Sequence, residues 1–305
     1  MRGSRGAILA TLGAGLLWGS SFSVIKLGLR TIDPYWFVFL RFGCASVLAL
    51  LYLGLAGRLR EVAALLRNPL VIWLGVTNAV GFVFQFKGQT LTTAGHAALI
   101  INSCTIYVAI ASRFLFQERF GALKTIAVAA GMGGVFLVTT GGRLGAAIGP
   151  TLQGDLLVLV AAFTWAAFIL LDKRIVQTVS LDVRALTGAL VIVTAVAALP
   201  CALFLGRGAF PTASPEWWTI PYTAVFCTVI PFFLWTWGLK RITATASSVI
   251  MLSEVVFALA LAAAILGERL SPVGFAGSAL IVLAVLLASR EARGEPVTGP
   301  DLVPE

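Results

Sequence analysis

An internal repeat constrains the fold of this chain more than any other feature. Trp18 and Lys26 recur 147 residues later as Trp165 and Lys173. Because the offset stays nearly constant across long apolar stretches, one hydrophobic unit occurs twice in the chain. The further matches lie 150 residues apart and pair Gly88, Thr93, Ala94, Ile100, Ser103, Glu118 and Arg119 with Gly238, Thr243, Ala244, Ile250, Ser253, Glu268 and Arg269.

The composition places these units in a membrane. Hydrophobic residues make up 59% of the chain, charged residues only 11%, and the mean hydropathy is +0.98. A soluble globular protein has about 25% charged residues, so that class is excluded. Ten apolar runs have about the 20-residue length that a helix needs to cross the hydrocarbon core. The predicted spans are 8–29, 35–56, 70–91, 95–117, 121–141, 155–173, 184–206, 216–238, 246–267 and 272–290.

The number of spans fixes how the two units are related. Each half holds five spans, and consecutive spans cross the membrane in alternating directions. The sequence therefore predicts an all-α polytopic membrane protein of ten transmembrane helices, arranged as two inverted five-helix repeats. We expect the first repeat at 1–145, the second at 150–290, and a polar, disordered cytoplasmic tail at 291–305.

The distribution of charge indicates an orientation. The 22 lysines and arginines give a net charge of +9 and a pI of about 10.0. Most of them fall on the same side of the predicted topology as both chain ends, in loops, at span ends or in the chain ends themselves, which is the positive-inside pattern. We therefore expect both termini in the cytoplasm and the loop at 142–154 outside. The excess of basic residues therefore indicates membrane topology rather than nucleic-acid binding. The expected partners are the lipid bilayer and a small-molecule substrate. We expect the chain to work as a monomer.

Motifs for enzyme chemistry are missing from the sequence. His96 is the only histidine, which excludes an H-E-x-x-H metal site, and there is no G-x-S-x-G or Cys/His cluster. The four cysteines lie in predicted spans and are interpreted as small apolar residues. We therefore expect neither an enzyme nor a cofactor or metal site. A channel or a receptor would leave the inverted duplication unexplained.

Local motifs resemble a known family. The fourth span runs into Gln117-Glu118-Arg119-Phe120 and the ninth into Gly267-Glu268-Arg269-Leu270, which resemble the G-E-R-L ending of EamA-type transporters. Trp18-Gly19 resembles the opening of their first span. Over about residues 7–290 the chain is thus similar to ten-helix members of the drug/metabolite transporter superfamily. Members usually carry Glu-Pro or a bare Pro midway along spans four and nine, where this chain has Cys104-Thr105 and Glu254-Val255.

The resemblance implies a function. It implies a secondary transporter of the bacterial inner membrane that exports amino acids or related small metabolites. Two inverted repeats can exchange conformations, so alternating access is the expected mechanism. Export of aromatic or cationic xenobiotics is the alternative.

Polar side chains in the third span mark one part of a candidate solute site. Asn78 and Gln85 are seven residues apart and project from one helix face. Exposure to lipid would be costly, so they either line a watery cavity or hydrogen-bond a neighbouring helix. Gly81, and Pro231 at the equivalent depth of the eighth span, are expected to break their helices and free backbone carbonyls.

The fourth and ninth spans supply further polar candidates for substrate binding. Glu254 is the only acid that we place clearly inside a span, so it is the best single functional candidate and the expected source of any pH dependence. The alternative for Glu254 is a neutral, hydrogen-bonded group that fixes helix packing. A lone histidine is more often a structural donor than a ligand. The candidates are His96, Asn102, Ser103, Tyr107, Ser253 and Glu254.

Mid-span tryptophans and small residues complete the set. Trp18 and Trp165 are repeat equivalents, and Trp235 is the counterpart of Gln85. Their indoles could wall a solute or stack on it, or could fill space between the repeats.

The buried cations Lys26, Arg41 and Lys87 lie in the outer half of their spans and are expected to snorkel outward or to line an outer vestibule. Small residues that should let spans five and ten pack together are Gly131, Gly134, Gly274 and Gly277.

Overall fold

The computed structural model describes residues 2–92, 94–118, 121–143, 152–179, 182–206, 215–266 and 271–294. Within these ranges the chain is helical and contains no β-strand. The elements are α1 Arg2–Gly28, α2 Pro34–Leu55, α3 Leu59–Leu65, α4 Pro69–Gln89, α5 Ala94–Asn102, α6 Cys104–Leu115, α7 Ala122–Thr140, α8 Leu152–Thr178, α9 Val183–Leu205, η2 Pro215–Trp218, α10 Thr219–Ala224, η3 Val225–Val229, α11 Ile230–Leu239, α12 Ala244–Met251, α13 Ser253–Leu266 and α14 Pro272–Gly294.

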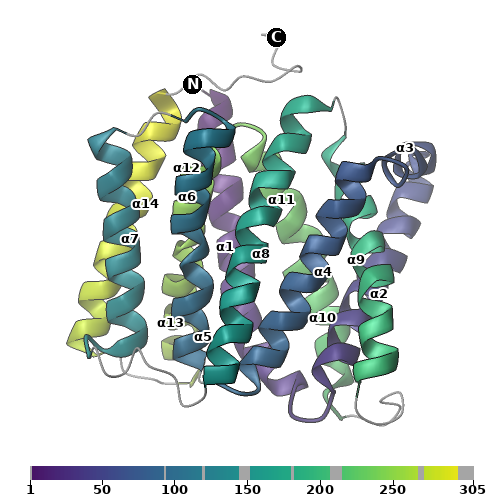
Figure 1. Cartoon of the computed structure of the whole chain (residues 1–305), viewed down its shortest axis with the longest axis horizontal. Coiled ribbons are helices and arrows are strands. Elements are labelled where there is room, and N and C mark those ends of the chain that lie inside the picture. Colours follow the sequence, from purple (N-terminus) through teal and green to yellow (C-terminus); the bar gives the residue numbers. More distant parts are fainter. Residues whose placement is uncertain are drawn as a thin grey trace.

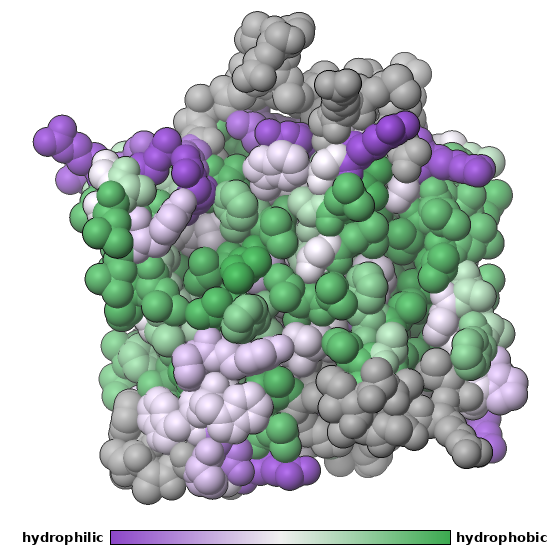
Figure 2. Space-filling model, turned by 180° about the vertical axis from the view of Figure 1, so that it is seen from behind, coloured by the Kyte–Doolittle hydropathy of each residue, from purple (hydrophilic) through white to green (hydrophobic). Residues whose placement is uncertain are grey.

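The helices match the predicted spans. Among the described residues, nine helical stretches are long and apolar enough to cross a membrane, and the 27-residue α1 is the tenth. Span four is α5 with α6, span eight runs from η2 to α11, and span nine is α12 with α13. Figure 2 shows a broad apolar belt between two more polar rims, as expected for a protein surrounded by lipid. The fold is thus that of an all-α polytopic membrane protein.

Local sequence explains where the spans begin. Asp33 accepts a hydrogen bond from the Tyr35 amide at 2.9 Å, and Pro34 occupies the first turn of α2. Asn68 caps α4 in the same way, again with a proline directly after it. A capping side chain followed by proline satisfies or removes the amides that a helix start leaves unpaired.

The two repeats run in opposite directions. Figure 1 shows α1 descending from the face where the chain begins, whereas its repeat equivalent α8 ascends toward that face. α14 ends at the face where α1 begins, so the described chain enters and leaves the bundle on one side. The loops after α2, α6, α8 and α11 lie on that same face, and most of the basic residues that we predicted to be internal lie in these loops or at the helix ends next to them.

The halves interleave rather than forming two separate bundles. α1 packs mainly against α11 and α13 of the second half, while α8 packs against α4, α5 and α6 of the first. A Cβ on Gly88 would lie 2.6 Å from the Val158 side chain, and a Cβ on its repeat equivalent Gly238 would lie 2.6 Å from Thr11. Thr11 is itself the repeat equivalent of Val158. The two glycines therefore lie at equivalent close helix crossings, α4 with α8 and α11 with α1, which have opposite orientations in the membrane.

α7 and α14 form the closest pairing between repeat equivalents. A Cβ on Gly134 would lie 2.6 Å from the Gly277 carbonyl oxygen, and a Cβ on Gly277 would lie 2.8 Å from that of Gly134. Gly131, one turn before Gly134, faces Leu252, which directly follows α12, and Ala284 of α14. Gly274 is buried near the start of α14. Small residues at these positions let the two helix backbones approach closely.

The expected helix break at Gly81 is wrong, because α4 is continuous through that residue. Gly81 instead gives room to α8: a Cβ there would lie 3.3 Å from Thr164 and 3.6 Å from the Trp165 ring. In the eighth span the irregularity precedes Pro231, as a π-helical turn over Val225–Val229. Spans four and nine are interrupted at Ser103 and at Leu252, although neither position carries a proline.

Candidate solute site at the seam between the repeats

Aromatic rings from both halves meet where α1 and α8 cross the bundle. Neighbouring ring centroids lie between 4.8 Å and 6.4 Å apart, mostly edge-to-face or tilted. These contacts tie helices of the first repeat to helices of the second, so the rings lie at the seam that alternating access would open. The rings of this seam cluster are Trp18, Phe42, Phe82, Trp165, Phe168, Phe232 and Trp235.

The two repeat-equivalent indoles are held by different acceptors. Trp165 Nε1 donates to Gln85 Oε1 at 2.8 Å, so the predicted amide of α4 does reach the seam. Trp18 Nε1 donates to the Cys227 carbonyl at 3.0 Å. Pro231 has no N–H to donate to that carbonyl, which lies four residues earlier in the helix. The proline thus makes a backbone acceptor available inside the membrane, as we expected.

Trp235 is nearly fully buried in the same cluster. Its Nε1 donates to Ser247 Oγ at 3.0 Å, and its ring stacks on Phe168 with centroids 5.6 Å apart. Because its N–H is already hydrogen-bonded, the indole offers a solute only apolar surface. Of the predicted residues, the structure therefore brings Trp18, Gln85, Trp165 and Trp235 together.

Arg41 places a cation against this cluster. Its Nε donates to Thr228 Oγ1 at 2.7 Å, and its Nη2 donates to the Cys227 carbonyl. The guanidinium carbon lies 4.7 Å from the Phe82 centroid and 5.5 Å from that of Phe42, within the range of cation–π attraction. The residue is only 1% exposed, so the expectation that Arg41 snorkels outward is wrong. The side chain of Lys26 lies outside the described part of the structure, and Lys87 is partly buried near the end of α4.

Asn78 has a different environment from Gln85. Its Nδ2 donates to Thr194 Oγ1 of α9 at 3.0 Å. The repeat-equivalent residue Thr228 is the acceptor of Arg41 on α2. Span three of each half therefore hydrogen-bonds span two of the other half. For Asn78 the structure favours interhelical packing over the lining of a cavity.

The polar groups of span four mostly bond within their own helix. Asn102 Nδ2 donates to the Ala98 carbonyl at 2.8 Å, and Ser103 Oγ donates to the Ile100 carbonyl at 2.6 Å. The Tyr107 ring stacks on Phe163 of α8 with centroids 4.3 Å apart. His96 lies in α5, but its side chain is outside the described residues.

Glu254 lies at the irregular middle of span nine. No hydrogen bond or ion pair holds its carboxylate among the residues that the structure describes, and the side chain is only partly buried. It is close enough to its repeat equivalent Cys104 to interact electrostatically. Ser253 Oγ is buried without a hydrogen-bond partner in the described part of the chain. Its oxygen would lie 2.8 Å from a Cβ on Gly15 of α1.

Sequence reasoning missed a second carboxyl group inside the bundle. Asp172 is fully buried in α8 and accepts a hydrogen bond from Thr236 Oγ1 at 2.8 Å. It directly precedes Lys173 and Arg174, at the end of the predicted span 155–173. α8 continues to Thr178, one and a half turns beyond. The signal in the sequence was that the residues after the predicted span also favour a helix, so that Asp172 does not lie at the helix end.

A buried ion cluster was also missed. Lys124 Nζ lies 3.4 Å from Glu118 Oε2 and 3.0 Å from Glu291 Oε1. Glu118 Oε1 also accepts from the Ala244 amide at 2.9 Å, at the start of α12. Glu118 belongs to the first of the two repeated Glu-Arg motifs. One role of this motif is therefore to bind the start of α12 and the buried Lys124. The cluster joins both halves at the face where α1 begins.

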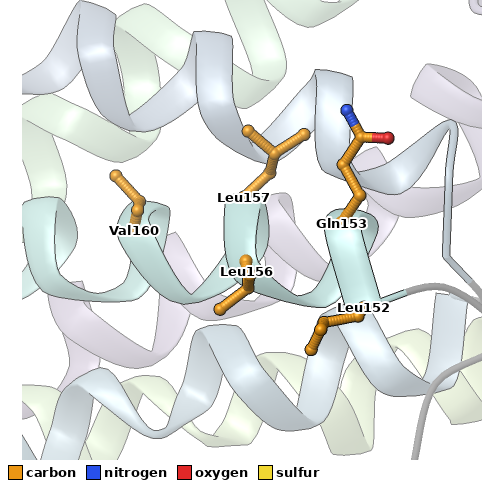
Figure 3. A pocket seen from close by; sticks show the side chains of 5 residues that line it. All are labelled: Leu152, Gln153, Leu156, Leu157 and Val160. Atoms are coloured by element: carbon orange, nitrogen blue, oxygen red, sulfur yellow. The ribbon is translucent and has the colours of Figure 1, made fainter.

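The pocket drawn in Figure 3 is not a solute site. It has a volume of about 480 Å³ and is lined by four apolar residues and Gln153 at the start of α8. Leu152 is 75% exposed and Leu156 51%, so this groove faces lipid. Among the described residues, no three His, Cys, Asp or Glu side chains are grouped as metal ligands.

The fold and the seam define a class: polytopic membrane proteins built from two inverted five-helix repeats that meet at a buried aromatic and polar interface. The model of the EamA-like transporter family matches residues 5–140 and 152–290. The chain therefore belongs to the EamA-like transporter family.

Individual relatives are named as transporters. An "uncharacterized inner membrane transporter YedA" of Escherichia coli K12 is 27% identical over 279 residues, covering 90% of this chain and 87% of that protein. An "uncharacterized transporter" of Archaeoglobus fulgidus is 28% identical over 239 residues, 77% of this chain and 80% of that protein. A "probable amino-acid metabolite efflux pump" of Salmonella typhimurium is 27% identical over 276 residues, 88% and 89% of the two chains.

A solved crystal structure has the same fold. It superimposes with a TM-score of 0.78 at 19% identity and covers 94% of this chain and 98% of the other. At that identity, the likeness concerns the fold alone.

Proposed function

We propose that this protein is a secondary transporter of the bacterial inner membrane that exports amino acids or related small metabolites. The observation that carries the proposal is the seam cluster, where rings, an amide and hydroxyl groups of both repeats come together. Such a mixture suits small zwitterions with an apolar side chain. The similarity to the Salmonella typhimurium efflux pump supports the same solute class.

Alternating access between the two repeats is the proposed mechanism. The crossings at Gly88 and Gly238 are equivalent but inverted. Exchanging the conformations of the halves would move the opening from one membrane face to the other. Both termini are proposed to be cytoplasmic, because the basic loops lie on the face where α1 begins. The chain would need no cofactor and no catalytic group for this task, and a monomer contains both repeats.

Transport by purified protein in liposomes tests the proposal. The vesicles would be loaded with each of the twenty amino acids, with and without an imposed pH gradient, and efflux of labelled solute would be measured. We expect saturable efflux of a subset of apolar or aromatic amino acids. Ethidium and methyl viologen, as aromatic cations, test the xenobiotic alternative. Efflux of these cations without efflux of any amino acid would contradict the proposal.

A further inference from the structure

The guanidinium of Arg41 uses only one of its two binding edges on the protein. Nε and Nη2 donate to Thr228 and to the Cys227 carbonyl. Nη1 is buried and has no hydrogen-bond partner among the described residues. A guanidinium carries five N–H donors, so the edge formed by Nη1 and Nη2 retains free donors.

This cation also lacks a counter-ion in the part of the chain that the structure describes. The ion pairs there involve Arg58, Lys124 and Arg184, but not Arg41. A charged side chain inside a membrane is costly unless it is paired, and such residues usually mark a solute or ion pathway. Two aromatic faces and two neutral acceptors compensate the charge only in part.

A cation occurs at the position of Arg41 in the first repeat only. Counted from the first residues of α2 and α9, Pro34 and Val183, its counterpart in the other repeat is Leu190, which is 1% exposed. Packing between the repeats therefore does not require a cation at this place. Arg41 also contacts the seam cluster through the Phe42 and Phe82 rings. The Cys227 carbonyl accepts from both Trp18 and Arg41, so the cation and the first-repeat indole share one anchor.

We propose that the Nη1/Nη2 edge of Arg41 binds the carboxylate of the transported solute, while rings of the seam cluster hold its apolar part. This inference rests on the proposed export function and narrows its substrates to solutes that carry a carboxylate. A planar guanidinium fork matches a carboxylate bidentately, which a lysine cannot do. Because Arg41 is 1% exposed here, the solute enters when the repeats move apart at the seam.

The same geometry predicts selectivity against organic cations. A solute with a positive charge and no carboxylate would meet an unpaired guanidinium next to the rings that could otherwise stack on it. Carboxamides keep the shape of the amino acid, but their uncharged amide group cannot form an ion pair with the guanidinium. Amino acid, carboxamide and decarboxylated amine therefore form a graded series of probes.

Competition measurements in liposomes test the inference. The probes are L-phenylalanine, L-leucine and L-threonine, their carboxamides and their decarboxylated amines. For the wild type we expect each transported amino acid to compete at least tenfold better than its carboxamide, and the amine to compete least. Arg41→Gln should reduce the preference for acid over carboxamide to about twofold. Arg41→Lys should keep an intermediate preference, and Arg174→Gln, on the exposed end of α8, should leave it unchanged.

Each failure has a distinct meaning. If the Arg41→Gln variant folds and transports but keeps the tenfold preference for acid over carboxamide, the role of Arg41 is refuted. If that variant does not fold, the thermal stability of the wild type decides: equal stabilisation by an amino acid and by its carboxamide overturns the inference. If the wild type moves no amino acid at all, the proposed export function fails. Arg41 is then judged by 3-phenylpropanoate against 3-phenylpropanamide, and equal thermal shifts with these two probes refute carboxylate binding as well.

Discussion

At the scale of single residues, the two carboxyl groups inside the bundle have different surroundings. Asp172 is fully buried, accepts from Thr236 and directly precedes Lys173 in α8. Glu254 is only partly buried and has no hydrogen-bond partner among the described residues. A group that carries protons between two sides must be reachable and free to change its charge. Glu254 meets those conditions better than Asp172.

We predict that Glu254→Gln abolishes accumulation driven by a pH gradient and retains solute exchange without a gradient. Glutamine keeps the shape of the side chain but cannot bind or release a proton. Asp172→Asn is the matched control, since it removes the other buried carboxyl group, and coupling should persist in it. Solute uptake into liposomes with and without the gradient gives both readouts. Accumulation by the Gln variant at the parent level would show that Glu254 is structural.

A second prediction at this scale concerns the indoles. Trp18→Ala and Trp165→Ala should each lower transport severalfold, because each removes a ring from the seam cluster together with its hydrogen bond to Cys227 or Gln85. Both rings are only partly buried, so their removal should cost less than the roughly 3–5 kcal/mol of a core Trp→Ala change, and folding and expression should be largely kept. Transport rates are compared per folded protein. Normal transport by the double variant would mean that the indoles fill space only.

At the scale of helices, close crossings decide which substitutions are tolerated. A Cβ on Gly134 would lie 2.6 Å from the Gly277 carbonyl oxygen, whereas a Cβ on the adjacent Gly133 would meet no atom within 4 Å. We predict that Gly134→Ala lowers the free energy of unfolding by about 1–3 kcal/mol through overpacking. Gly133→Ala should change it by less than about 0.5 kcal/mol. Thermal unfolding in detergent compares the two, and equal stabilities would contradict the α7–α14 contact.

The start of α9 should give stability a dependence on pH. Arg184 hydrogen-bonds Asp182 and, together with the nearby Arg58, holds the pKa of that carboxyl below its usual value. A lowered folded-state pKa means that the stabilisation is present above the unfolded pKa of about 3.9 and is lost as the pH falls through the folded value. Asp182→Asn should therefore be less stable than the parent at pH 7. The difference should shrink as the pH falls below about 3.9 and vanish once the pH is below the lowered folded-state pKa; unfolding curves over this range measure it.

The sequence predicted elements much better than contacts. Apolar run lengths located every span, and the repeat with its odd span count gave the inverted arrangement. Gly81 was misinterpreted because a glycine that loosens a helix and one that admits a neighbouring ring look alike in sequence. Arg41 was misinterpreted because its depth is compatible with snorkelling until its acceptor on a helix 187 residues away is known. Asn78 and Gln85 share a helix face but contact different helices, which periodicity alone does not distinguish.

At the scale of the whole molecule, the orientation in the membrane follows from which face carries the basic loops. Arg143 follows α7 on one face, and Arg174 lies near the end of α8 at the other; both are exposed. In a cysteine-free background, we predict that Arg143→Cys is labelled by an impermeant maleimide on intact cells. Arg174→Cys should react only after permeabilisation. The reverse pattern would invert the topology.

The interleaving of the halves has a consequence for how the protein is made. Trp18 and its acceptor Cys227 are 209 residues apart. At about 5–20 residues per second, synthesis of that stretch takes on the order of 10–40 s. During this time α1 is in the bilayer without α11 and α13, and its indole lacks the carbonyl that accepts its hydrogen bond. α1 therefore meets these partners only after most of the second repeat has been made, and a chain that stops before α11 leaves α1 without them.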